Sequence, residues 1–144
     1  MIPIEWKYTE RGNKDKSIGK DGATRKSRYL DLINESQYLN DNTLTCCWFE
    51  QFYQLMRQTL WAEQLLKHKP KGFEADDYLH IHVVPEGNTA LFDKLYPCSK
   101  KNLTETWKGC LTDPDKYIVI SPEQFWSKQS KDTDLYAYLK KRYW

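Results

Sequence analysis

The chain opens with the ten residues MIPIEWKYTE, which run from Met1 to Glu10. This run combines β-branched and aromatic residues with a proline near its start, a composition that predicts a β-strand over residues 2–8. Side chains repeat with a period of two along a strand, so Glu5 and Lys7 project from the same face. A carboxylate and an ammonium group side by side at the end of a strand can hold a divalent cation and an anionic substrate together. We therefore expect the functional site on this strand.

Length and composition favour one folded domain over residues 1–144, with a single core. Hydrophobic residues make up 40% of the sequence and charged residues 29%, a balance typical of folded rather than disordered proteins. No apolar run approaches the roughly 20 residues of a transmembrane helix, and Glu5 and Lys7 interrupt any signal-peptide core. We expect a cytoplasmic protein without a membrane partner.

The four cysteines lie at positions 46, 47, 98 and 110, and no C-x-x-C pair occurs. Adjacent cysteines do not make a zinc knuckle, and a reducing compartment keeps thiols reduced. The pattern favours four free thiols that pack as small core residues, rather than a disulfide framework.

Positive charge is concentrated directly after the first strand, although the net charge of the chain is only +2. Between Arg11 and Arg28 the sequence holds seven basic and two acidic residues. Such a segment can track a phosphate backbone, and a solvated loop is the alternative. Arg57 and Gln58, on a predicted helix, are further candidates for phosphate contact, and a place on the helix surface is the alternative. The expected nucleic-acid-binding residues are Arg11, Lys20, Arg25, Lys26, Arg28 and Arg57.

Strands and helices alternate along the rest of the chain. Two more strands are predicted at 78–84 and 117–120, and helices at 24–39, 47–68, 88–95, 103–110, 121–126 and 133–143. The helix at 47–68 carries bulky apolar residues at spacings of three and four, so it has one apolar face to cover a sheet. We expect an α/β fold with a small mixed sheet flanked by helices. Because a typical sheet has about five or six strands, we also expect that the N-terminal strands of the sheet are missing upstream of Met1.

Glu5 alone provides too few protein ligands for a metal ion, so a partner carboxylate is needed. Glu10, just past the first strand, is the expected auxiliary ligand. Asp76 and Asp77 precede a strand, where paired acids are typical of solvated turns. His80 and His82 share a strand face as zinc ligands can, but catalytic zinc usually takes three protein ligands. A polar strand face or a substrate contact is therefore favoured for the two histidines.

The segment Ile4-Glu5-Trp6-Lys7 resembles the E-x-K end of the PD-(D/E)XK nuclease superfamily, which has the restriction-endonuclease-like fold. The run from Pro3 to Glu10, the helical stretch 54–58 and the strand end 82–85 are similar to a prokaryotic branch of that superfamily. The resemblance spans residues 2 to about 126. It implies that Glu5 is a ligand of Mg²⁺ (or Mn²⁺), that Lys7 is the catalytic lysine, and that DNA is the substrate. The superfamily's metal-binding Asp, on a preceding strand, has no counterpart in this sequence.

With this resemblance, the sequence predicts a metal-dependent endodeoxyribonuclease domain that hydrolyses phosphodiester bonds. The domain is expected to be incomplete at its start, and to be inactive alone because the upstream metal-binding Asp is absent. A non-enzymatic DNA- or protein-binding module that retains the fold is the alternative, and an interaction protein with a coincidental E-x-K is a third. An unpaired strand edge beside residues 2–8 favours pairing with a homodimer mate or with a complementing N-terminal chain.

Overall fold

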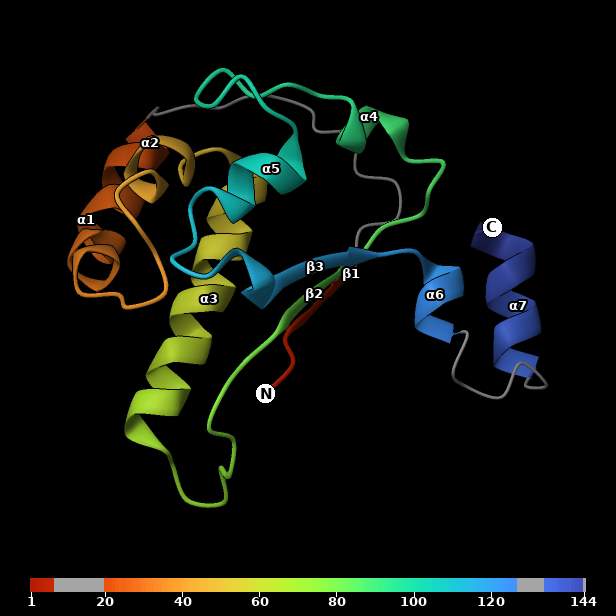
Figure 1. Cartoon of the computed structure of the whole chain (residues 1–144), viewed down its shortest axis with the longest axis horizontal. Coiled ribbons are helices and arrows are strands. Elements are labelled where there is room, and N and C mark those ends of the chain that lie inside the picture. Colours follow the sequence, from red (N-terminus) through yellow and green to blue (C-terminus); the bar gives the residue numbers. More distant parts are fainter. Residues whose placement is uncertain (7–19, 127–133, 144) are drawn as a thin grey trace.

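The computed structural model describes residues 1–6, 20–126 and 134–143 of the chain, and Figure 1 shows their arrangement. Strands and helices alternate as expected, and the α/β fold class is confirmed. The elements are β1 (Ile4–Trp6), α1 (Lys20–Asn34), α2 (Thr43–Cys46), α3 (Glu50–His68), β2 (His80–Val83), α4 (Thr89–Phe92), α5 (Leu103–Lys108), the 3₁₀ turn η1 (Pro114–Lys116), β3 (Tyr117–Ile120), α6 (Pro122–Trp126) and α7 (Asp134–Tyr143).

The described strands form a parallel sheet in the order β1-β2-β3, rather than the mixed sheet that was expected. Glu5 lies opposite His82, and His82 lies opposite Val119. The pairing extends to the start of the chain, since the amide of Leu79 donates to the carbonyl of Met1 at 3.0 Å. The first strand is therefore fixed along its whole described length by contacts with β2.

The two faces of the sheet differ in character. The alternation along the strands puts Glu5, His82 and Val119 on one face and the isoleucines at positions 4, 81 and 118 on the other. The first face looks toward α3, because Tyr117 on that face belongs to the same buried core as the apolar side of α3. Ile4 on the second face is 47% exposed. The helices therefore cover the polar face of the sheet more completely than the isoleucine face.

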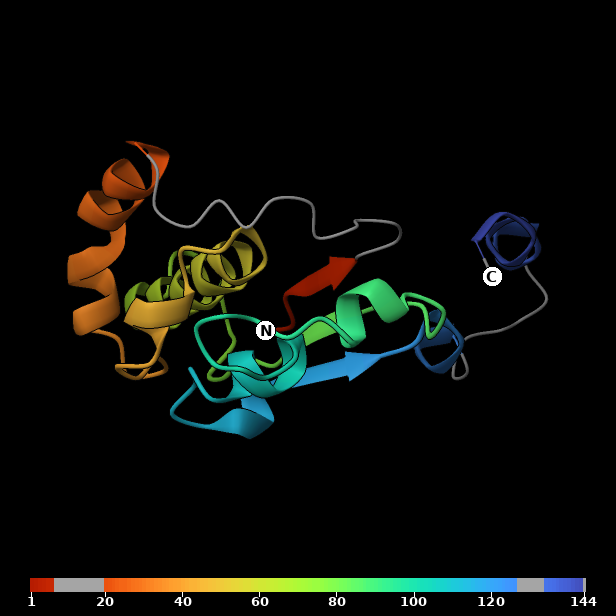
Figure 2. The same ribbon diagram turned by 90° about the horizontal axis from the view of Figure 1, so that it is seen from above.

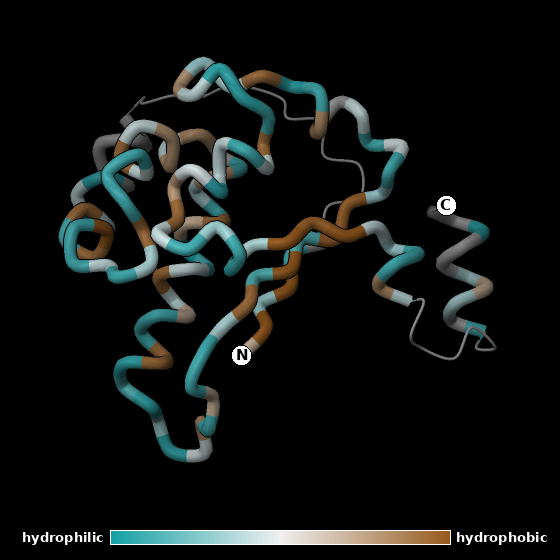
Figure 3. The backbone as a smooth tube through the Cα atoms, in the orientation of Figure 1, coloured by the Kyte–Doolittle hydropathy of each residue, from teal (hydrophilic) through white to brown (hydrophobic). Residues whose placement is uncertain are grey.

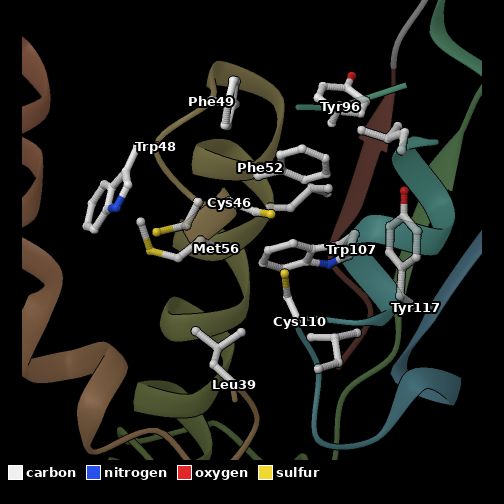
Figure 4. Close-up of a cluster of buried hydrophobic side chains, with 14 of the residues drawn as sticks. Leu39, Cys46, Trp48, Phe49, Phe52, Met56, Tyr96, Trp107, Cys110 and Tyr117 are labelled. Carbon is white, nitrogen blue, oxygen red and sulfur yellow. The ribbon is translucent and has the colours of Figure 1, made fainter. Parts of the chain in front are cut away.

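The core is built on the apolar side of α3, whose residues Phe52, Leu55 and Met56 are fully or almost fully buried. Phe52 stacks against Trp107 of α5 with ring centroids 6.3 Å apart and meets Tyr96 edge-on at 4.6 Å, as Figure 4 shows. The predicted apolar face of the long helix is thus confirmed. The helix begins at Glu50 rather than at residue 47, because the residues before it form the short helix α2.

The helix α1 starts and ends earlier than the predicted range 24–39. A buried carboxylate accounts for its end. Glu63 of α3 accepts hydrogen bonds from the hydroxyl of Ser36 at 2.6 Å and from the amide of Gln37 at 2.7 Å. The Ser36 oxygen in turn accepts from the amides of Tyr38 and Leu39. These bonds hold residues 36–39 in a turn that a continuing helix would not allow.

The prediction of four free thiols is wrong, because Cys46 and Cys98 form a disulfide bond. The helix α2, which the sequence did not predict, sets Cys46 beside the turn between α4 and α5, with a Cα–Cα distance of 5.6 Å that suits a disulfide. Cys47 and Cys110 are free and buried. Burial raises the pKa of the Cys47 thiol to about 12 and that of Cys110 to about 11, so both stay protonated and unreactive.

Hydrophobic segments gather in the strands and along one side of α3, as the colouring in Figure 3 shows. None of the helices in the described ranges combines the length and the apolar character needed to cross a membrane.

We predict that reduction of the Cys46–Cys98 bond lowers the free energy of unfolding by about 2–4 kcal/mol. The bond joins residues 52 positions apart, and opening so long a loop restores conformational freedom to the unfolded chain. Urea unfolding with and without a reductant measures the change. A double variant, Cys46→Ala with Cys98→Ala, is the control, because its stability should not respond to the reductant. An unfolding midpoint of the unaltered chain that ignores the reductant would contradict the prediction.

Candidate functional site

A pocket opens where β1, α1 and α3 meet, and it contains the side chain of Glu5. Figure 2 shows β1 as the edge strand on the side of α1. The volume of the pocket is about 530 Å³. Its walls come from Glu5 of β1, from Tyr29 and Leu32 of α1, and from Gln54, Arg57, Gln58, Leu60, Trp61 and Gln64 of α3. The strand that was expected to carry the site thus faces a cavity large enough for a ligand.

A second stripe of side chains runs along α3 on the side away from its apolar face. The residues Gln54, Arg57, Gln58, Trp61 and Gln64 recur at spacings of three and four, which brings them to one side of a helix. All five line the pocket. Arg57 and Gln58 were expected to face a cleft from this helix, and Trp61 was not. Trp61 lies four positions after Arg57 on a predicted helix, and this spacing places both side chains on the same side, so the sequence could have indicated Trp61 as well.

Gln58 ties the carboxylate of Glu5 to the helix. Its Nε2 amide donates a hydrogen bond to Oε2 of Glu5, across 53 positions of sequence. The other end of the same amide, Oε1 of Gln58, is buried and has no hydrogen-bond partner within the described part of the chain. A buried acceptor without a partner costs free energy. The pocket therefore presents one positioned carboxylate, while the oxygen of the amide that holds it is buried.

His80, His82 and Tyr117 lie behind Glu5 on the same face of the sheet. The ring Nδ1 of His82 is 2.6 Å from the hydroxyl of Tyr117. Burial lowers the pKa of His80 to about 4, and the negative charge of Glu5 opposes that shift only in part. Burial also raises the pKa of Tyr117 above its ordinary value. His80 and Tyr117 are therefore neutral at pH 7, and the charge on this part of the sheet belongs to Glu5.

The two histidines share a polar strand face as predicted, but the helices bury that face, with His80 and His82 each at most 2% exposed. A direct contact between these side chains and a substrate on the surface is therefore ruled out in this conformation. Across residues 1–6, 20–126 and 134–143, no group of three His, Cys, Asp or Glu residues is placed to hold a metal ion. The structure gives no support to a zinc centre at this strand.

The predicted site residues fall into three groups. Glu5 and Arg57 both line the pocket. Lys26 and Arg28 are exposed on α1 and do not line the pocket, and Lys20 and Arg25 belong to the same helix. Lys7, Glu10 and Arg11 lie outside the described residues.

Arg57 is held in place by an aromatic neighbour. Its guanidinium carbon lies 5.6 Å from the ring centre of Tyr53, and Tyr53 meets Tyr29 of α1 edge-on at 5.7 Å. The Arg57 side chain is therefore oriented by packing between α1 and α3 while it remains exposed to solvent.

The acidic pair at the start of the second predicted strand has a structural role, in line with the solvated turn expected there. Asp76 pairs with Lys69 and Asp77 with Lys116, each at 2.5 Å, and both carboxylates are exposed. These ion pairs lower the pKa of each carboxyl group. Both acids contact lysines that do not line the pocket.

The oxygen atoms in the pocket suit a hard divalent cation better than zinc. Mg²⁺ is commonly bound by one or two carboxylates, and waters and substrate phosphates complete its coordination. Glu5 provides one such carboxylate, and the Gln58 amide holds it in place. Glu5, held by Gln58, therefore fits a Mg²⁺ site in which the substrate and other groups would supply the remaining ligands of the ion.

A family model described as restriction endonuclease associating with ARP matches the chain over residues 1–144. No curated protein and no solved structure matches the chain. The match supports a restriction-endonuclease-like family and a nuclease-like domain.

Because His80 is buried, we predict that the free energy of unfolding falls in mild acid. The unfolded state has the ordinary histidine pKa of 6.5 and binds a proton first, whereas the folded state binds it only near pH 4. The contribution of neutral, buried His80 to the free energy of unfolding is therefore complete above about pH 6.5, and it is lost as the pH falls toward 4. We expect a loss of about 2–3 kcal/mol across this window.

Urea unfolding at pH 7.0, 5.5 and 4.5 measures this loss, and a His80→Leu variant should show a clearly smaller one. His68→Ala is the matched control, because His68 is exposed at the end of α3. Equal pH dependence in the His80 and His68 variants would refute the assignment.

Proposed function

The chain belongs to the family of restriction endonucleases associating with ARP, and on that premise we propose that it is a Mg²⁺-dependent endodeoxyribonuclease domain of PD-(D/E)XK type. It would hydrolyse DNA phosphodiester bonds at the pocket beside Glu5. The observation that carries the proposal is the position of Glu5. This carboxylate lies on an edge strand, is held by Gln58, and shares a pocket with the cation of Arg57.

Each residue of the proposed site has a distinct role. Glu5 binds the metal ion, Gln58 orients the carboxylate, and Glu10 is an auxiliary ligand. A bound Mg²⁺ (or Mn²⁺) would neutralise charge on the phosphate and lower the pKa of a water molecule. Lys7 follows Glu5 by two positions, and its ammonium would stabilise the negative charge that develops on the phosphate. Arg57 would bind a phosphate of the same strand.

DNA affinity would come from the basic residues that follow the first strand. Lys26 and Arg28 are exposed on α1, the helix that supplies Tyr29 to the pocket wall. With Arg11, Lys20 and Arg25 they would contact phosphates on either side of the cleaved bond. Such contacts release counterions, so binding should weaken steeply with salt.

A protein partner is part of the proposal, because the family description names an association with ARP. The strand β1 is an edge of the described sheet, and the backbone on its outer side is a template for another strand. A homodimer mate or a complementing chain that pairs there could bring a second carboxylate to Glu5. This arrangement would supply the Asp that the superfamily places on the neighbouring strand.

A non-enzymatic DNA- or protein-binding module remains the second candidate. The observation that favours it is the acid content of the pocket, since Glu5 is the one carboxylate among the described residues that line it. A module of this kind would bind DNA in a salt-dependent way without cleaving it.

We predict that the chain, with its partner if one is required, cleaves plasmid DNA in the presence of Mg²⁺, and that Glu5→Gln lowers the rate by at least about 100-fold. Lys7→Ala should have a similar effect. Glu123→Gln, a matched change on the exposed surface of α6, should leave the rate unchanged. Cleavage that survives both Glu5→Gln and Lys7→Ala would exclude the proposed site, and DNA binding without cleavage would favour the second candidate.

Gln58→Leu should raise the Mg²⁺ concentration needed for half-maximal cleavage by about 10–100-fold, because the carboxylate of Glu5 loses the group that orients it. A titration of the cleavage rate with Mg²⁺ measures this shift. A loss of maximal rate at unchanged Mg²⁺ dependence would instead indicate that Gln58 does not act through the metal ligand.

A further inference from the structure

The pocket beside Glu5 extends well past the carboxylate and reaches Trp61 and Gln64, further along α3. A metal ion and one phosphate would fill only part of its volume of about 530 Å³, which is in the range of pockets that hold whole small-molecule ligands. We propose that the pocket receives an unpaired nucleobase of the DNA strand, stacked on Trp61, and that the substrate class is therefore DNA with unpaired nucleotides. This inference rests on the proposed function.

The aromatic lining of the pocket is the first observation. Trp61 is 56% exposed, although a tryptophan of a folded domain is normally well covered. Tyr29 lines the same pocket from α1. Every base has a flat π-face, and stacking on an aromatic side chain is the main sequence-independent way in which proteins hold unpaired bases. An exposed tryptophan inside a pocket that already contains a tyrosine therefore suits a planar ligand.

The amide side chains are the second observation. Gln54, Gln58 and Gln64 lie on the pocket side of α3, spaced over successive turns. An amide offers both a donor and an acceptor, as the edge of a base does. The polar lining of the pocket thus suits the edge of a base better than an aliphatic ligand.

The distribution of charge orients the nucleotide. Arg57 lies four residues before Trp61, which is about 6 Å along a helix. The cation therefore stands roughly one turn from the stacking surface, on the side of Glu5 and the sheet. A phosphate would sit at Arg57, near the proposed metal ion, while its base points along α3 toward Trp61 and Gln64. The charges of Glu5 and Arg57 also make the pocket unsuitable for an acyl chain.

A fully paired duplex cannot fill this pocket, because its bases are stacked and hydrogen-bonded inside the helix. A base must be unpaired, or pulled out of the stack at a cost of free energy, before it can enter. Overhangs, single strands and mismatched sites meet that condition at the lowest cost. The pocket therefore predicts a preference among DNA structures rather than among sequences.

The experiment measures DNA binding by fluorescence anisotropy in EDTA, so that cleavage plays no part. Three labelled probes of equal phosphate number are compared with the full chain: a blunt duplex, a duplex with a single-stranded overhang, and the same overhang with abasic sites. We expect the overhang to bind about 5–100-fold more tightly than the blunt duplex, and the abasic overhang to lose this advantage.

Variants at position 61 assign the effect to the pocket. Trp61→Ala should abolish the preference for the overhang and keep binding to the blunt duplex, whereas Trp61→Phe should retain most of the preference. Tyr138→Ala is the control, because Tyr138 is also an exposed aromatic residue and belongs to α7, which lies far from α3 in Figures 1 and 2. Equal affinity for the three probes, or a preference that persists in Trp61→Ala, would overturn the inference.

A parallel cleavage assay with Mg²⁺ separates this inference from the proposed function. Preference for the overhang without cleavage would support the base pocket and count against the nuclease. Cleavage of blunt and overhang probes at equal rates, unaffected by Trp61→Ala, would support the nuclease and count against the pocket.

Discussion

The hydrogen bond between Gln58 and Glu5 joins the two parts on which the proposed site depends. It connects an edge strand of three described residues to α3, the longest of the described helices. The strand supplies a carboxylate and the helix supplies the cation, the amides and the aromatic surface around it. The bond fixes one oxygen of the carboxylate, so the negative charge has a defined position relative to the other side chains of the pocket.

The helix α3 serves the core and the pocket at the same time. Its apolar side packs Phe52 against Trp107 and Tyr96, and the opposite side lines the pocket. Glu63 adds a third connection, because it holds the turn that follows α1. The distance between the walls of the pocket is therefore set by packing inside the domain, and this gives a site on a small sheet the rigidity that binding requires.

Much of the fold could be read from local patterns, because strand alternation and helical spacing are local properties. The strands at 117–120 and around 80, and the apolar face of α3, follow from them directly. The end of α1 could not be predicted, since it depends on Glu63, a partner 27 positions from Ser36. The disulfide was missed for a similar reason, because only the fold brings Cys46 to Cys98. Among the residues that line the pocket, Glu5 was singled out from its position on a strand, and its functional role stays a prediction. The pocket and the place of Trp61 in it depend on the packing of α1 against α3.

The parallel pairing of β1 with β2 has a consequence for the order in which the protein assembles. The two strands join parts of the chain that lie far apart, as the contact of Met1 with the carbonyl of Asp77 shows at a separation of 76 positions. Contacts between residues so far apart in the sequence form late in folding, because closing the long loop between them costs conformational entropy before the strand pairing contributes any stabilisation. A chain emerging from the ribosome therefore carries Glu5 first but acquires its pocket only after the second strand has been made. The chemistry proposed for this domain would thus be withheld from nascent and partly unfolded molecules by topology alone.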